Sequence, residues 1–294
     1  MLKTVFWRRV LFLLILFILA LGTVVSSLSL GASLPSASAK NSPYLQVTFL
    51  AVGQGDSIFI ETPEGVQMLI DGGPDSSVLR SLGAVMSPFD REIDVVLATH
   101  DDQDHIGGLV DVLERYQVKH IIETNNEKET STTEALALNI KTEPAGTYLG
   151  RVGQAINLGA STTFTVLSPP ADTKNWESNT ASIVGKLSFG EIDFFLTGDA
   201  PSGIEDYLVG RFGQMLESEV LKLGHHGSKT STSENFLDTV KPEYAVVSAG
   251  KDNRYGHPHQ EVVSRVEERG IKIKSTAMEG SITFLTDGVT VWQK

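Results

Sequence analysis

The sequence contains no cysteine among its 294 residues. Disulfide bonds, thiolate catalysis and cysteine-ligated zinc are therefore excluded, and the chain is compatible with either a reducing or an oxidising compartment. Positive charge is also scarce, because 24 Lys and Arg stand against 36 Asp and Glu, a formal net charge of −12. Three of the cations and none of the acids fall in residues 1–39, so the rest of the chain carries −15. Such a surface repels free nucleic acid at long range, so any polyanionic substrate must be drawn in locally, by metal ions and a few lysines.

Long apolar runs are scarce as well, and only residues 10–25 form one. Lys3, Arg8 and Arg9 precede this run, and a Ser/Ala-rich stretch that ends at Ala39 follows it. The arrangement predicts an export signal whose positive flank stays in the cytoplasm. The segment is either cleaved after Ala39 or kept as a single membrane anchor. In both cases the rest of the chain is expected outside the cytoplasmic membrane, secreted or held on its outer face.

Residues 40–294 are expected to form one domain, because no low-complexity linker divides them and 41% hydrophobic residues can bury a sizeable core. Two halves each begin with strand patterns and continue with helical ones, which predicts an α/β fold of two sheets packed face to face with helices outside, a four-layer αββα sandwich. Strands are expected at residues 45–52, 57–61, 66–70, 93–99, 118–123, 163–167, 182–189, 193–197, 220–223, 244–248, 271–275, 281–286 and 290–292. Helices are expected at residues 109–116, 134–138, 204–211, 234–240 and 260–269.

A dense group of potential metal ligands follows the predicted strand at 93–99. His100, Asp102, Asp104 and His105 lie within six residues, and two glycines then open the following helix without side-chain crowding. A loop at the carboxyl end of a strand can present several imidazole and carboxylate groups to one point. These groups suit Zn²⁺, Mn²⁺ or Fe, and two neighbouring ions would hold a hydroxide nucleophile between them. The pattern favours a metal hydrolase over its alternative, an acidic surface loop.

Further ligand candidates stand at the ends of other predicted strands. Asp71 follows the strand at 66–70, Asp199 follows 193–197, and His225 and His226 follow 220–223. Side chains at the carboxyl ends of adjacent strands converge on one edge of a sheet, so these residues are expected to join a site for two ions about 3.5–4 Å apart. Asp199 is the candidate for a bridging carboxylate. The alternatives are a helix N-cap for Asp199 and a surface pair for the two histidines.

Seven short blocks occur in a characteristic order along the chain. They are residues 52–57 (VGQGDS), 69–73 (LIDGG), 99–108 (THDDQDHIGG), 178–182 (SNTAS), 198–199 (GD), 221–228 (LKLGHHGS) and 255–258 (YGHP). With these blocks the chain resembles the metallo-β-lactamase superfamily, and within it the extracytoplasmic hydrolase domain of ComEC-type DNA-uptake (competence) proteins, over nearly all of residues 46–294. The resemblance implies the αββα fold, a dinuclear metal centre and hydrolysis of a phosphodiester.

The resemblance also implies metal ligands. His100 and Asp102 would serve one metal and Asp104 and His105 the other, with Asp199 bridging them and either His225 or His226 completing the second. The superfamily's broader pattern has His where this chain has Asp102 and Asn179. Both replacements make the first site rich in oxygen and favour harder ions, so Mn²⁺ is expected to rival or exceed Zn²⁺ there and occupancy of that site to be weak.

Other residues of the blocks are expected to act in catalysis or to support the ligands. Asp104 is expected to be required for turnover, and His257 to hold a phosphate oxygen or to protonate the leaving group. The first block has Ala51 where the family pattern begins with Asp, which predicts altered support of the ligands and not loss of the site. The further candidates are Gln54, Asp56, Asp71 and Asn179 for metal binding or ligand support, and Lys222, Lys229 and Asn253 for substrate binding beside His257.

Three functions are compatible with these residues. The first is an exported metal-dependent phosphodiesterase or nuclease, whose substrate is a phosphodiester, with DNA as one candidate. The second is an esterase acting on cell-envelope phosphodiesters of the phosphocholine type, or a lactonase, and the third is a non-catalytic binding module stabilised by a metal. No protein partner can be inferred. ComEC-type proteins carry this domain on a multi-span channel, whereas this sequence has one apolar run, so a stand-alone relative and not a DNA pore is expected.

Overall fold

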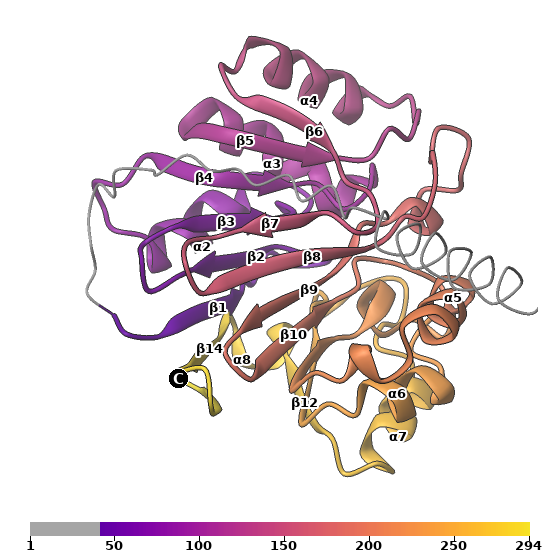
Figure 1. Cartoon of the computed structure of the whole chain (residues 1–294). Helices are drawn as coiled ribbons and strands as arrows, with labels where there is room; N and C mark the ends of the chain where they lie inside the picture. Colours follow the sequence, from indigo (N-terminus) through magenta and orange to yellow (C-terminus); the bar gives the residue numbers. More distant parts are fainter. Residues whose placement is uncertain (1–41) are drawn as a thin grey trace, which may run out of the picture.

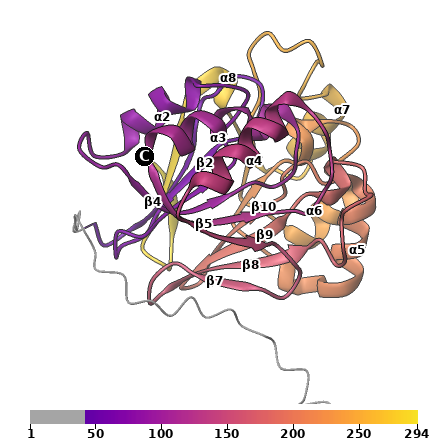
Figure 2. The same cartoon turned by 90° about the horizontal axis from the view of Figure 1, so that it is seen from above.

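The computed structural model describes residues 42–294. Two β-sheets pack face to face, and each is covered on its outer side by helices (Figures 1 and 2). One sheet has eight strands in the order β15-β14-β1-β2-β3-β4-β5-β6, and the other has seven in the order β13-β12-β11-β10-β9-β8-β7. The predicted four-layer αββα sandwich is therefore confirmed.

The eight-stranded sheet is built mainly from the first half of the chain. Strands β3, β4, β5 and β6, which end at one edge of the sheet, run parallel, and the strands on the β1 side pair antiparallel. Three helices pack on its outer face through residues such as Leu82, Leu109 and Leu136. The strands are β1 (Leu45–Phe49), β2 (Ile58–Glu61), β3 (Gln67–Ile70), β4 (Glu92–Leu97), β5 (Gln117–Glu123), β6 (Gly146–Leu149), β14 (Ile282–Thr286) and β15 (Val291–Gln293), and the helices α2 (Ser77–Val85), α3 (Gln103–Arg115) and α4 (Ser131–Thr142).

The seven-stranded sheet is built from the second half. Its strands β10 to β13 run parallel, and β7 to β10 pair antiparallel. Helices α5, α6 and α7 cover its outer face through residues such as Leu208, Phe236 and Val262. The elements are β7 (Ala155–Asn157), β8 (Thr162–Ser168), β9 (Val184–Phe189), β10 (Ile192–Leu196), β11 (Val220–Lys222), β12 (Tyr244–Val247), β13 (Lys272–Ser275), α5 (Ser202–Phe212), α6 (Glu234–Val240), α7 (Gln260–Glu267), α8 (Thr276–Glu279) and the 3₁₀ turns η1 (Asn179–Ala181), η2 (Gly213–Leu216) and η3 (Gly224–Gly227).

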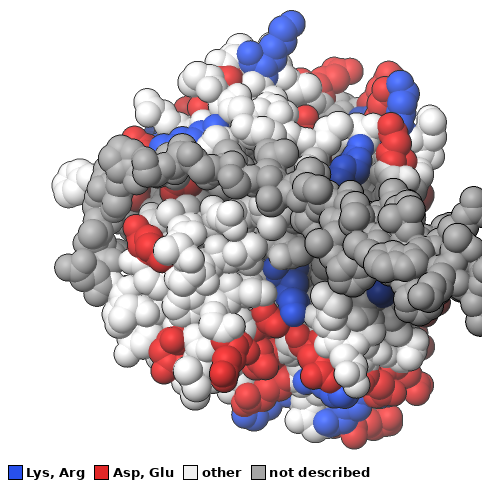
Figure 3. Space-filling view, in the orientation of Figure 1, with Lys and Arg blue, Asp and Glu red and all other residues white. Residues whose placement is uncertain are grey.

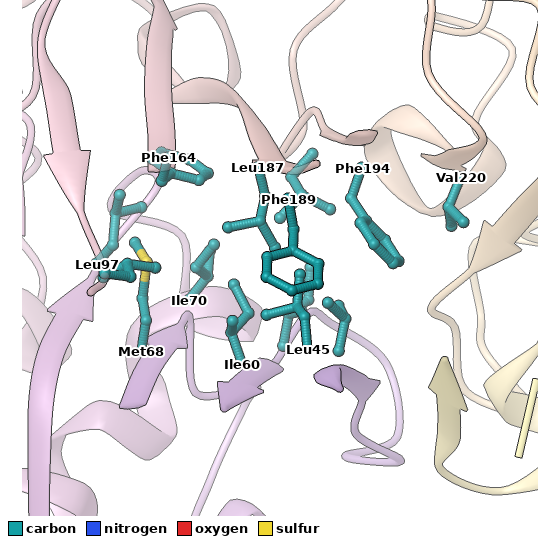
Figure 4. Packing of buried hydrophobic residues seen from close by; sticks show 14 of the residues in the cluster. Leu45, Ile60, Met68, Ile70, Leu97, Phe164, Leu187, Phe189, Phe194 and Val220 are labelled. Atoms are coloured by element: carbon teal, nitrogen blue, oxygen red, sulfur yellow. The ribbon is translucent and has the colours of Figure 1, made fainter. Parts of the chain in front are cut away.

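The main core lies between the two sheets. Figure 4 shows Ile60 and Met68 of the eight-stranded sheet facing Phe164, Leu187 and Phe194 of the seven-stranded sheet, all of them buried. Burying a side chain of this size contributes about 1.5–3 kcal/mol relative to leaving it in water. The sheets therefore form a rigid support, and the loops at the carboxyl ends of their strands are held in fixed positions.

One helix begins earlier than the sequence pattern predicts, and the difference bears on the site. Helix α3 begins at Gln103 instead of residue 109, so Asp104 and His105 lie in its first turn. The first turn of α3 lacks the apolar periodicity that predicts a helix, because it carries the candidate ligands Asp104 and His105. Helices α2 and α8 and strands β6 and β7 lie outside the elements expected from the sequence, and α8, β6 and β7 are each only three or four residues long.

The predicted export segment, residues 1–39, lies outside the described residues, and the predicted division of the chain after Ala39 stays a prediction. In the described part of the chain, no helix combines the length and the apolar character needed to cross a lipid bilayer.

Candidate metal centre

The candidate ligands gather where loops from both sheets meet. Asp71 follows β3, His100 lies beyond the end of β4, and Asp199 and His226 follow β10 and β11. The structure brings Asp56, His105, Asp199 and His226 together, with one ligand-type atom of each within 4.8 Å of the others, and all four residues are buried. The buried pocket thus draws side chains from both halves of the chain.

Asp199 is at the centre of this pocket. Its Oδ2 lies 3.3 Å from Nε2 of His105 and 3.2 Å from Nε2 of His226. The Nε2 atom of His225 is farther away, at 3.8 Å. Donor atoms bound to one ion at about 2.1 Å lie about 3 Å apart, so these separations match a metal coordination shell.

The backbone at the ligands adopts an uncommon conformation. Asp71, His225 and His226 have φ angles of 59°, 48° and 57°, in the left-handed region that residues with a Cβ rarely adopt. Each such residue costs about 1–3 kcal/mol, and such costs concentrate at functional sites. In η3, two successive left-handed residues turn the backbone sharply, and both imidazoles face Asp199.

Hydrogen bonds at Nδ1 fix the orientation of the two central imidazoles. Nδ1 of His105 lies 2.7 Å from Oδ2 of Asp71, and Nδ1 of His226 lies 2.9 Å from the carbonyl oxygen of Ser248. These oxygens accept hydrogen bonds, so Nδ1 donates, and Nε2 is the ring atom that carries a lone pair for a metal once its proton has left. Nε2 of each ring therefore faces carboxylate oxygens, and a positive charge stabilises this arrangement, either a proton on Nε2 or a metal ion in its place.

The imidazoles of His100 and His225 are also oriented by a hydrogen bond from Nδ1, in each case to a threonine hydroxyl. The hydroxyl of Thr99 donates to Asp71 at 2.7 Å, so it accepts the hydrogen bond from Nδ1 of His100 at 3.0 Å. The hydroxyl of Thr230 donates to the hydroxyl of Ser228 at 3.1 Å and accepts from Nδ1 of His225 at 3.1 Å. Asp71, predicted as a ligand or as ligand support, thus orients His105 directly and His100 through Thr99. Thr99 was not among the predicted site residues.

Unpartnered acceptors test whether these residues fit a metal. The buried side-chain atoms without a hydrogen bond in residues 42–294 include four from candidate ligands: Nε2 of His100, His105 and His226, and Oδ1 of Asn179. Each would cost about 1–3 kcal/mol if it stayed unsatisfied. Imidazole, carboxylate and amide donors are the ligands of Zn²⁺, Mn²⁺ and Fe, so the residues present fit a divalent metal.

The charges of the pocket shift its titrations strongly. Burial lowers the pKa of His105, but Asp199 and Asp71 outweigh burial and raise it well above its usual value. Burial also lowers the pKa of His226, but Asp199 and Asp104 outweigh it and raise this pKa well above its usual value. Burial raises the pKa of Asp199, yet His226 and His105 hold it well below its ordinary range. Without metal, the rings of His105 and His226 therefore hold a proton at Nε2, and a metal ion that binds these atoms displaces it.

Lys222 lies behind the pocket and is fully buried. Its ammonium pairs with Asp56, donates to the carbonyl oxygen of Gly198 at 2.9 Å and lies 3.5 Å from Oδ1 of Asp199. Because this side chain has no solvent exposure, the structure contradicts the substrate-binding role predicted for Lys222. The residue belongs to the inner strand β11, where even its ammonium faces the protein interior.

Asp56 and Gln54 support the site from the loop between β1 and β2. The carboxylate of Asp56 pairs with Lys222 and lies 3.4 Å from Nδ1 of His226, the ring atom turned away from Asp199. Gln54 accepts a hydrogen bond from the backbone N–H of Gly250 at 3.2 Å. Both residues therefore hold other parts of the site in place, although Asp56 also lies within metal-binding distance of the cluster.

Asp102 and Asp104 differ in their partners. Oδ2 of Asp104 lies 3.2 Å from Nε2 of His226, on the side that also faces Asp199. Asp102, which precedes α3, is paired instead with Lys128, whose Nζ lies 2.7 Å from its Oδ1. Lys128 was not among the predicted site residues, because it stands in a polar stretch without periodicity.

The loop that carries His257 borders the pocket. The His257 ring centroid lies 5.4 Å from that of His225 and 6.1 Å from that of His226. Burial, with the charges of His226 and His225, lowers the pKa of His257 to about 4. Both ends of the Asn253 amide bind the backbone of His257, so Asn253 fixes this loop. Lys229 is exposed beside the loop, and its backbone N–H donates to His259 at 3.1 Å.

The sequence is similar to those of known proteins. A model of the metallo-beta-lactamase superfamily matches residues 50–251. ComE operon protein 3 of Bacillus subtilis (strain 168) is 32% identical over 256 residues, covering 81% of this chain and 33% of that protein. Recombination protein 2 of Haemophilus influenzae is 30% identical over 257 residues, covering 85% of this chain and 30% of that protein. The chain thus spans about a third of the length of these relatives.

A solved structure agrees at the level of the fold. The metallo-beta-lactamase fold protein YhfI from Bacillus subtilis superposes with a TM-score of 0.53 at 11% identity, covering 85% of this chain and 100% of that chain. The family match extends over more than half of the sequence and includes the ligands from His100 to His226. The likeness to ComEC-type proteins is confirmed, and the chain belongs to the metallo-β-lactamase superfamily.

Proposed function

We propose that the protein is an exported metal-dependent phosphodiesterase of the nuclease type that binds two divalent ions. One observation carries the proposal. The Asp199 carboxylate presents a single oxygen to the Nε2 atoms of His105 and His226 at 3.2–3.3 Å, and both rings are held through Nδ1, so that Nε2 is turned toward this oxygen. Such a set of donors supports metal-assisted hydrolysis, for which the superfamily provides the precedent.

The ligands divide into two sets that share Asp199. His100, Asp102 and Asn179 would hold the first ion, and Asp104, His105 and His226 the second. His226 is preferred to His225 because its Nε2 lies 3.2 Å from both Asp104 and Asp199, whereas Nε2 of His225 lies 3.8 Å from Asp199. Bound ions would supply Lewis acidity and lower the pKa of water. Since the first set is rich in oxygen, Mn²⁺ is expected to rival or exceed Zn²⁺.

His257 is the residue we assign to the substrate. With a pKa of about 4 its imidazole is neutral at pH 7, so it donates a hydrogen bond more readily than it delivers a proton. We therefore favour contact with a phosphate oxygen over protonation of the leaving group. Asn253 holds the backbone of His257 in place, and the exposed Lys229 offers a positive charge nearby.

The surface bears on the choice of substrate. On the coloured part of the face in Figure 3, lysines and arginines are interspersed with carboxylates. Together with the net charge of −12, this pattern gives long duplex DNA little general attraction. A short or single phosphodiester, including one of a cell-envelope polymer, fits such a surface equally well. The names of two relatives, a competence protein and a recombination protein, favour nucleic acid as the substrate.

The test is a panel of substrates. Metal-free protein, supplied with Mn²⁺ or Zn²⁺, is assayed on an oligonucleotide, a phosphocholine diester and a lactone. Hydrolysis of the oligonucleotide alone supports the nuclease, and hydrolysis of the phosphocholine diester alone favours the envelope esterase. Metal binding without turnover on any member of the panel would instead indicate a binding module.

A further inference from the structure

The ion pair between Lys128 and Asp102 lies at the edge of the metal centre. Nζ of Lys128 is 2.7 Å from Oδ1 of Asp102, and the two side chains are 40% and 28% exposed. Lys128 belongs to the loop that joins β5 to α4, so it reaches Asp102 from a neighbouring segment of the same sheet edge. The pair is therefore in contact with solvent, and its lysine can leave without any change in the core.

The two metal positions differ in how their charges are satisfied. At the second position, carboxylate oxygens of Asp104 and Asp199 both lie 3.2 Å from Nε2 of His226. At the first position, Nε2 of His100 and Oδ1 of Asn179 are buried without a hydrogen bond among the described residues, as the Nε2 atoms of His105 and His226 are at the second. The only charged donor we assign to the first position alone is Asp102, and a lysine already neutralises it.

We propose that Lys128 is a resident cation of the first metal position and sets its affinity. An ion that binds Asp102 must displace this ammonium or lie beside it, and both cost free energy. The second position, formed by Asp104 and His105, therefore binds the first ion that is added. The first position, formed by His100 and Asp102, binds the next ion and binds it more weakly. This inference rests on the dinuclear centre of the proposed function, and it concerns the filling of that centre and not the reaction.

The size of the effect follows from the exposure of the pair. Solvent-exposed ion pairs are weak, so loss of the lysine should tighten the second step of metal binding about two- to fivefold. The first step should not change, because Lys128 makes no ion pair with Asp104, His105 or Asp199. A change confined to one binding step separates this role from a general effect on folding.

The experiment titrates the metal-free full chain with Mn²⁺ and follows free Mn²⁺ by its electron paramagnetic resonance signal. Lys128→Met should tighten the weaker class of sites two- to fivefold and leave the tighter class within error, and Lys128→Arg should behave as the wild type. Lys174→Met is the matched control, because Lys174 pairs with Glu127 of the same loop at 2.7 Å but not with a ligand. Thermal unfolding of each variant checks that the fold is kept.

If the affinity of the weaker class of Mn²⁺ sites is unchanged or lower in Lys128→Met, the inference is overturned. Lys128 would then support Asp102 as a ligand. If the wild type binds a single ion, appearance of a second site in Lys128→Met supports the inference, and a single site in both contradicts it. Failure of the proposed function is distinguishable, because it is absence of hydrolysis by the fully loaded wild type, while the titration measures binding alone.

Discussion

The ammonium of Lys222 lies 3.5 Å from Oδ1 of Asp199, and this contact leaves Oδ2 of the same carboxylate to the imidazoles. One oxygen thus faces a fixed positive charge, and the other faces the place expected for metal. Because Oδ1 of Asp199 is already engaged by Lys222, only Oδ2 is presented to the imidazoles and to a metal ion.

Replacing Lys222 should therefore cost stability. Lys222→Met removes a buried cation and leaves Asp56 and Asp199 without it, so we expect a loss of about 3–5 kcal/mol in the free energy of unfolding. The double variant Lys222→Met with Asp56→Asn removes one charge of each sign and should recover part of that loss. Urea unfolding measures both, and a double variant no more stable than the single one would show that charge pairing with Asp56 is not the reason.

Removal of a ligand on α3 should abolish turnover but not folding. Asp104→Asn or His105→Ala is expected to lower the hydrolysis rate about a thousandfold or more, or about 4 kcal/mol of transition-state stabilisation. Asp111→Asn, on the same helix but outside the ligand cluster, is the control and should keep full activity. A ligand variant that keeps a tenth of the wild-type rate would exclude its residue from the mechanism.

Metal preference should follow the oxygen donors of the first position. We expect activity restored with Mn²⁺ to exceed that restored with Zn²⁺ in the wild type. Replacing both Asp102 and Asn179 by His introduces nitrogen donors and should shift the ratio of the two activities toward Zn²⁺. The measurement is the Mn²⁺-to-Zn²⁺ activity ratio on one substrate, and the argument fails if the ratio does not move.

Glu123, at the end of β5, should make stability depend on pH. Burial, with the charge of Asp101, raises its pKa from the ordinary 4.5 to about 7. Between these values the folded protein keeps a proton that the unfolded chain has lost, so stability falls as pH rises from 4.5 to 7. Glu123→Gln removes this penalty, and we expect it to stabilise the protein by about 1–3 kcal/mol at pH 8 and to have little effect at pH 4.

The control for that prediction lies on the next loop. Glu129→Gln removes a carboxylate from an exposed position and should leave the difference between the two pH values unchanged. Unfolding by urea at pH 4, 6 and 8 gives the comparison. Equal stabilisation by Glu123→Gln at all three pH values would show that the effect is not a titration.

Location can be tested with a reporter fused after Lys294. The positive residues before the apolar run at 10–25 predict that the domain lies outside the cytoplasmic membrane. The reporter should therefore be active only there, and activity confined to the cytoplasm would contradict the prediction. If the wild-type protein is released by cleavage, bulky residues in place of Ala37 and Ala39 should keep it on the membrane. Wild-type protein found on the membrane at full length would exclude cleavage.

The sequence predicted well those features that depend on strand position. Asp71, Asp199 and the two histidines of η3 follow strands whose apolar runs are easily recognised, so their meeting at one edge could be expected from topology. Lys222 could not be placed in this way, because a lysine is usually exposed and its burial depends on Asp56, a residue far away in the sequence. Lys128 was missed for a similar reason, since its contact with Asp102 joins two loops that lack periodicity.

The pocket draws Asp104 and His105 from one half of the chain and Asp199 and His226 from the other. No partial chain that ends before η3 carries the complete set of ligands, so the choice of metal is made by the finished fold and not by the growing polypeptide. If the chain crosses the membrane before it folds, it selects its ions from the pool outside the cell membrane. The metal supply of that compartment, more than the relative affinities of the site, would then decide which ion the working protein contains.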